Sequence, residues 1–199
     1  MPIFEKNGFI ETLDYYVLGE VCQFIQSHKS DNLPVISVNL SGVTIMKHNF
    51  VQQVAGIVDS YGLSPRQLDL EITESALIKN FAVATDKIRQ LRELGFTIAM
   101  DDFGVGISSL GRLKNIPLDT LKIDRQFIVD ALESKKGASI VAHIVGMAQE
   151  LQLETVAEGL ETNQQIEFFR NLGCDVGQGY GFARPMPQSD FLAFLEKQN

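Results

Sequence analysis

The sequence alternates short runs of aliphatic and β-branched residues with longer runs whose apolar residues recur every three or four positions. The longer runs predict helices at residues 12–27, 50–61, 81–94, 138–151, 162–171 and 191–195. A glycine closes three of them, namely Gly62, Gly95 and Gly173. The short runs predict strands at residues 34–41, 68–73, 96–101, 119–123, 154–157 and 175–177. Strands that alternate with helices indicate a mostly parallel sheet of the α/β class.

The polar residues of the predicted strands lie on one face of the sheet, because side chains two apart on a strand share a face. Asn39 shares its face with Ser37, and Glu71 shares its face with Asp69 and Thr73. The opposite face of the same strands is aliphatic. An open sheet covered by helices on both faces needs apolar side chains on both. The pattern therefore favours the alternative, a barrel of the TIM type with its site at the carboxyl ends of the strands.

The composition fits one globular domain of 199 residues, and no run of 18 or more apolar residues is long enough to span a membrane. The formal net charge of -8 argues against DNA or RNA as a partner, because nucleic-acid binding needs a basic surface. Residues 1–9 lack a secretory signal pattern, and Cys22 and Cys174 are too far apart for a metal pair. We therefore expect a cytoplasmic domain with reduced thiols and no membrane contact.

Polar residues end six predicted strands in succession: Asn39, Glu71, Asp101 with Asp102, Lys122, Glu158 and Gln178. A single acid in such a place usually begins a solvated loop or caps the next helix. Six in succession indicate a site, because a barrel brings its strand ends together at one rim. Carboxylate and amide oxygens suit Mg²⁺ or Mn²⁺, and adjacent acids can hold two ions for phosphodiester hydrolysis.

A glycine-bearing loop follows the third of these strand ends and contains Gly104, Gly106, Ser108 and Ser109. The glycines permit tight turns, and either serine could cap the next helix. We interpret the loop as a mobile cover of the site; cradling of a phosphate and an ordinary turn are the alternatives. Neither the dinucleotide-fold fingerprint nor a P-loop lysine is present.

Apolar residues after the last predicted strand offer a further surface. Phe182, Pro185 and Met186 could form a ledge for a nucleotide base, and core packing is the alternative interpretation. The three histidines (His28, His48 and His143) lack metal-ligand spacing, and no serine-hydrolase elbow is present.

Several motifs cover nearly the whole chain in order: Val-Asn-Leu-Ser at 38–41, Leu-Glu-Ile-Thr-Glu at 70–74, Asp-Asp-Phe-Gly at 101–104, Ser-Ser-Leu at 108–110, Leu-Lys-Ile-Asp at 121–124, Ala-Glu-Gly-Leu-Glu at 157–161, Gln-Gly-Tyr at 178–180 and Arg-Pro at 184–185. With them the chain resembles the EAL-domain family of cyclic di-GMP phosphodiesterases. The resemblance implies a variant TIM barrel and hydrolysis of cyclic di-GMP to linear pGpG. It also implies that the domain is part of a larger multidomain signalling protein.

The resemblance assigns roles to the strand-end residues. It implies two Mg²⁺ or Mn²⁺ ions held by Asn39, Glu71, Asp101, Asp102 and Glu158. It further implies that Lys122 assists the attacking water, that Gln178 positions water or the second ion, and that Glu158 has a catalytic role besides its metal contact. The residues expected to contact the nucleotide are Asp124, Phe182, Arg184, Pro185 and Met186.

The chain also departs from the family. No Glu-Ala-Leu tripeptide occurs, and residues 1–5 resemble the segment that follows the strand carrying it. We therefore expect an incomplete barrel with about six strands, formed by a single N-terminally truncated domain over residues 1–199. The gap would expose two sheet edges, which predicts either a homodimer or a distorted barrel. Val105 and Ile107 replace a threonine and an aromatic residue that are usual in the family's glycine loop.

Three functional hypotheses follow. The first is a metal-dependent phosphodiesterase, whose retained ligand set supports it although this chain alone is expected to be weak or inactive. The second is a receptor that binds cyclic di-GMP without cleaving it, which the missing motif glutamate supports. The third is an interaction domain with no ligand. Metal-dependent turnover separates the first two, and lack of nucleotide binding would favour the third.

Overall fold

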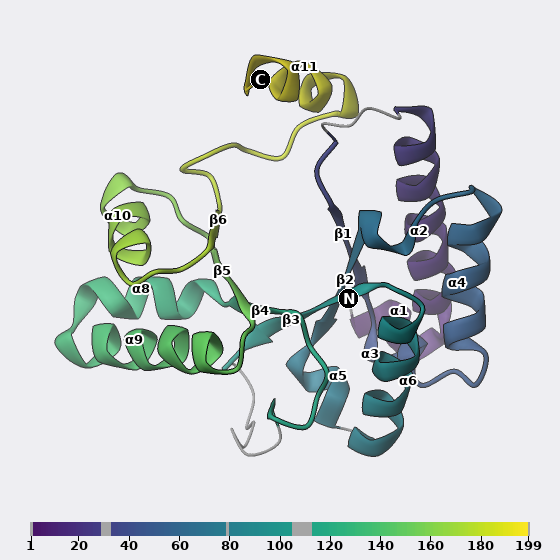
Figure 1. Cartoon of the computed structure of the whole chain (residues 1–199), viewed down its shortest axis with the longest axis horizontal. Helices are drawn as coiled ribbons and strands as arrows, with labels where there is room; N and C mark the ends of the chain where they lie inside the picture. The colour runs from purple at the N-terminus through teal and green to yellow at the C-terminus, as the bar shows by residue number, and fades with distance from the viewer. Residues whose placement is uncertain (1, 29–32, 79, 105–112, 199) are drawn as a thin grey trace.

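Six parallel strands form one sheet in the order in which they occur along the chain, as a computed structural model of residues 2–28, 33–78, 80–104 and 113–198 shows (Figure 1). They are β1 (Ile36–Leu40), β2 (Leu68–Thr73), β3 (Thr97–Phe103), β4 (Thr120–Ile123), β5 (Glu154–Glu158) and β6 (Val176–Gln178). The sheet curls into a half-barrel. The α/β class and the incomplete barrel predicted from the strand pattern are therefore confirmed.

Helices follow most of the strands: α1 (Pro2–Asn7), α2 (Phe9–Ser27), α3 (Gly42–Ile45), α4 (Phe50–Ser60), α5 (Glu74–Ile78), α6 (Phe81–Glu93), α8 (Arg125–Glu133), α9 (Lys135–Glu150), α10 (Asn163–Asn171) and α11 (Gln188–Gln198), with a short 3-10 turn η1 (Pro65–Gln67). Figure 1 shows α2 and α4 beside the first strands and α8 to α10 beside the last ones. None of the helices within the described residues is long and apolar enough to cross a membrane.

The sequence pattern missed α1, α3, α5 and α8. Two of them, α3 and α5, have only four and five residues, too few to show a 3.6-residue period. The start of α8 is fixed instead by a cap, because the Asp124 side chain accepts a hydrogen bond from the backbone N–H of Gln126. Gly62 and Gly95 do close their helices, with φ of 62° and 99°.

The two faces of the sheet differ as the alternation predicted. Residues of the outer face are buried under the helices: Val38, Leu40, Leu68, Leu70, Ile72, Ile98, Met100, Leu121 and Ile123. The inner face is polar, and its middle is closed to water, since Glu71, Thr120 and Lys122 are buried. At the two edge strands, by contrast, Asn39 and Gln178 are exposed. The half-barrel is thus packed at its centre and open at its edges.

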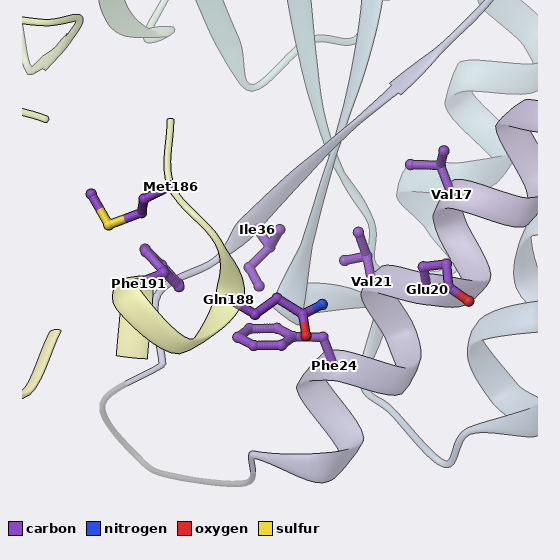
Figure 2. A pocket seen from close by; sticks show the side chains of 8 residues that line it. All are labelled: Val17, Glu20, Val21, Phe24, Ile36, Met186, Gln188 and Phe191. Atoms are coloured by element: carbon purple, nitrogen blue, oxygen red, sulfur yellow. The ribbon is translucent and has the colours of Figure 1, made fainter. Parts of the chain in front are cut away.

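The C-terminal helix α11 returns to the first elements of the chain. The rings of Phe24 and Phe191 lie 6.3 Å apart between their centroids. An apolar hollow of about 270 Å³ lies between α2, β1 and α11 (Figure 2). Its lining residues are Val17, Glu20, Val21, Phe24, Ile36, Met186, Gln188 and Phe191. Met186 therefore lies in a hollow formed mainly by apolar side chains.

Candidate active site

The carboxyl ends of the strands bring the predicted polar residues together. The register places Asn39 opposite Glu71, and Glu158 opposite Gln178. Lys122 lies between them on the central strand β4, with its side chain only 5% exposed. Because parallel strands end at the same rim, residues far apart in the sequence meet here.

Lys122 is the centre of the site. Its Nζ lies 2.7 Å from Glu71 Oε1, 2.6 Å from Glu158 Oε1 and 3.8 Å from Asp101 Oδ1. Burial by itself lowers the pKa of Lys122, but hydrogen bonds to Glu158 and Glu71 and the charges of both carboxylates outweigh it and raise the pKa above its ordinary value. The lysine is therefore a cation held by acids from three other strands.

Glu71 is held from two sides. Its Oε1 accepts the hydrogen bond from Lys122, and its Oε2 accepts one from Asn39 Nδ2 at 3.0 Å. Glu158 is held by Lys122 as well, and burial, together with the charges of Asp101 and Glu71, raises the pKa of Glu158 above its ordinary value despite that bond. Glu71 and Glu158 thus share the ammonium of Lys122 as their charged partner.

An irregularity in β3 determines the backbone conformation at the two adjacent acids, Asp101 and Asp102. The register between β3 and β4 shifts between Met100 and Phe103, and Asp102 has a φ of 55°. The backbone N–H of Asp102 donates to Asp101 Oδ1 at 2.9 Å. Burial and the charges of Asp101 and Asp124 raise the pKa of Asp102. Left-handed backbone at a residue other than glycine costs free energy, and such strain gathers at functional sites.

The β1 end of the site is anchored by a buried acid that the sequence pattern did not single out. Asp14 Oδ2 on α2 accepts hydrogen bonds from the backbone N–H of Ser41 at 2.9 Å and from Thr44 Oγ1 at 2.5 Å. Ser41 in turn caps α3. This network fixes the turn that begins two residues after Asn39. In the sequence Asp14 looks like any surface acid of an amphipathic helix, and only the folded structure shows that it is buried.

The start of the glycine loop is tied to the site by Glu74, a second residue that we had not predicted. The backbone N–H of Gly104 donates to Glu74 Oε2 at 2.8 Å, and Glu74 is buried. Gly104 has a φ of 93°, and a β-carbon there would lie 2.5 Å from the ring of Phe127. Gly106, Ser108 and Ser109 lie outside the described residues, so their predicted role is not tested.

A cleft of about 330 Å³ opens beside Glu158 at the ends of β5 and β6. Its lining residues are Arg125, Glu158, Gly159, Glu161, Gln178, Gly179 and Tyr180. Arg125 and Glu161 form an ion pair at 2.7 Å, and the Arg184 guanidinium lies 4.7 Å from the centre of the Tyr180 ring. Arg125 was missed by sequence reasoning, although its place just after a strand end was a usable signal.

The predicted nucleotide contacts do not all gather at this cleft. Phe182 covers the outer face of β6, because a β-carbon at Gly177 would lie 3.0 Å from its ring. Met186 lines the hollow in Figure 2 instead. Phe182 is 51% exposed and Met186 lines an apolar hollow, so the contact of these residues with a nucleotide base stays a prediction. Asp124 caps α8, and Pro185 is exposed.

The donor set suits a divalent metal ion in its chemistry but not in its present arrangement. Within the described ranges, no three His, Cys, Asp or Glu side chains are placed so that they could hold a metal ion. The ammonium of Lys122 lies among three of the predicted carboxylate ligands. Carboxylate and amide oxygens nevertheless converge from β1, β2, β3 and β5, as Mg²⁺ requires.

The fold and this arrangement define an α/β half-barrel with an acidic site at the carboxyl ends of its strands. The EAL domain profile matches residues 1–185, so the chain belongs to the EAL domain family. The chain is 40% identical over 193 residues to the cyclic di-GMP phosphodiesterase NbdA of Pseudomonas aeruginosa, covering 96% of this chain and 25% of NbdA. It is 35% identical over 204 residues to the probable cyclic di-GMP phosphodiesterase PdeB of Escherichia coli, covering 99% of this chain and 37% of PdeB.

A solved structure agrees with the fold. The phosphodiesterase PaMucR in its c-di-GMP complex matches with a TM-score of 0.89 and 37% identity, over 96% of this chain and 78% of that one. The chain spans only a quarter to about a third of the length of NbdA and PdeB. The matched region is therefore only one part of each of these relatives.

Proposed function

We propose that this chain is the hydrolytic domain of a cytoplasmic signalling protein and cleaves cyclic di-GMP to linear pGpG with Mg²⁺ or Mn²⁺. One observation carries the proposal: Glu71, Asp101 and Glu158 converge on Lys122 at the carboxyl ends of four neighbouring strands. The names of NbdA, PdeB and PaMucR support the choice of substrate.

The residues that would hold the metal are Asn39, Glu71, Asp101, Asp102 and Glu158. A bound ion supplies Lewis-acid stabilisation of the phosphodiester and a more acidic water. Lys122 would orient the attacking water and stabilise the charge that develops on phosphate through its ammonium group. Arg125 and Arg184, at or beside the cleft, offset the charge of the dinucleotide, and Gln178 positions water from the last strand.

A direct test is incubation with cyclic di-GMP and Mg²⁺ or Mn²⁺, followed by chromatography for pGpG. We expect product that disappears with a chelator. Asp101→Asn should lower turnover at least about 100-fold, because it removes an ionic metal ligand. Asp86→Asn is the matched control, since Asp86 is an exposed acid on α6 whose carboxylate accepts hydrogen bonds from Arg89 and Gln90 of the same helix. Equal turnover in both variants would contradict the proposed ligand set.

A receptor is the second candidate, and the open edges of the half-barrel favour it for this chain alone. Asn39 on β1 and Gln178 on β6 are exposed, so two members of the proposed set are not held in place on both sides. We expect weak turnover for that reason. Calorimetry with cyclic di-GMP in Ca²⁺ would reveal binding without cleavage, whereas absence of heat in every metal would favour an interaction domain.

A further inference from the structure

Every oxygen of Glu71, and one of Glu158, is already engaged by protein groups. Glu71 Oε1 and Glu158 Oε1 both accept hydrogen bonds from Lys122 Nζ, and Asn39 Nδ2 occupies Glu71 Oε2. These three oxygens thus have hydrogen-bond partners within the protein. It can remain folded with its acids paired, because a buried carboxylate without a partner would be costly.

Formal charges show that this pairing is incomplete. Glu71, Asp101 and Glu158 carry three negative charges and Lys122 carries one positive charge, which leaves -3 + 1 = -2. One divalent ion would bring the net charge of these four side chains to zero, so the lysine can remain in the site as a cation. The ion would nevertheless compete with the ammonium for the same carboxylate oxygens, because both cations are attracted to the same acids.

We propose that Lys122 is a displaceable counter-ion: its ammonium occupies the metal-binding carboxylates in the absence of metal, and binding of a divalent cation moves it off Glu71 and Glu158. This inference rests on the proposed function and deepens it. The lysine lowers the affinity for metal and keeps the domain folded without it. The same movement releases the ammonium so that it can face the phosphodiester.

The direction from which the ion arrives follows from exposure. The side chains of Asp101 and Glu158 are 15% and 19% exposed, whereas those of Lys122 and Glu71 are 5% and 7% exposed. A hydrated ion therefore meets Asp101 and Glu158 first, on the side of the cleft beside β5. The bond between Lys122 and Glu158 is the first that it has to replace.

The first experiment uses Lys122→Met and measures MnCl₂ binding by calorimetry and thermal unfolding with and without MnCl₂. We expect binding about tenfold tighter than in the wild type, within the range of coupled binding equilibria. We also expect a lower Tm without metal and a larger rise on adding MnCl₂, because the acids have lost the ammonium that pairs with them. Lys87→Met is the control, since Lys87 Nζ donates hydrogen bonds to two backbone carbonyls, those of Ile45 and Lys47.

A second measurement needs no variant at the site. The rate at which an amine-reactive reagent labels Lys122 in the wild type should rise severalfold with MgCl₂, while labelling of Lys87 stays constant. Equal metal affinity in Lys122→Met and wild type, or an unchanged labelling rate, would overturn the counter-ion role and leave the proposed metal site standing. Lack of MnCl₂ binding in both proteins would overturn the metal site itself and the inference with it.

Discussion

Single residues of the site were predictable by type and place, but their partners were not. The strand-end pattern identified Glu71, Lys122 and Glu158, because alternation and parallel topology fix where such side chains point. It did not reveal that the lysine lies among the acids. Glu74 and Arg125 were missed as well, since their roles depend on contacts with residues 30 and 36 positions away.

Gly104 is a position where one added methyl group should matter. A β-carbon would lie 2.5 Å from the ring of Phe127, and the φ of 93° is unfavourable for other residues. Gly104→Ala should therefore lower the free energy of unfolding by about 1–3 kcal/mol, as measured in urea. Gly56→Ala on α4 is the control, because nothing lies within 4 Å of its β-carbon and alanine favours the helix. If Gly104→Ala loses no more free energy of unfolding than Gly56→Ala does, the predicted strain at Gly104 is wrong.

The buried thiol of Cys22 should make stability depend on pH in alkaline solution. Burial raises its pKa to about 11 from 9.0. Between these values the unfolded chain has lost a proton that the folded chain keeps, so rising pH favours unfolding. The free energy of unfolding should fall by about 1.4 kcal/mol up to pH 10. Urea titrations at pH 8 and pH 10 measure this decrease. The Cys22→Ala variant should be less stable at both pH values, but its free energy of unfolding should decrease less between them.

At the scale of elements, the strands were predicted well and the short helices were not. The strands predicted at 68–73 and 119–123 differ by at most one residue from β2 and β4. Periodicity needs about two turns, which α3 and α5 do not have. Their positions depend on side chains that accept backbone hydrogen bonds, such as Ser41.

The attachment of α2 to the end of β1 and to α3 depends on Asp14. Asp14→Ala leaves the backbone N–H of Ser41 and the hydroxyl of Thr44 without this acceptor, and Thr44 is buried. We expect the free energy of unfolding to fall by about 1–3 kcal/mol. Glu20→Ala, an exposed acid on the same helix, should change it by less than about 0.5 kcal/mol. Similar losses of free energy of unfolding in both variants would show that the hydrogen bonds of Asp14 do not hold these elements together.

At the scale of the whole molecule, the curled shape followed from the polarity of the sheet. A face lined by Asp69, Glu71 and Lys122 cannot take a second layer of helices, so the sheet bends around it. The sequence could not reveal how far the edges stay open, because that depends on the final placement of α11 and on strand register.

The free edges of β1 and β6 predict self-association. Val176 on the inner face of β6 is 42% exposed, so Val176→Lys should place a charge at that edge and lower the apparent mass in light scattering. Val83→Lys is the control, because Val83 has a similar exposure but lies on α6. A monomeric mass for the unaltered chain would refute the homodimer.

The ion pairs of Lys122 have a consequence for how activity is inferred across related sequences. A domain whose own lysine pairs with its acids can lose catalysis through substitutions elsewhere and still keep each acid, because those acids and the lysine stabilise one another in the fold. A related sequence could then retain the complete set of acids because they stabilise the fold as well as because they serve turnover. Counting metal-ligand residues alone would therefore overestimate the number of active enzymes, and turnover has to be measured for each protein.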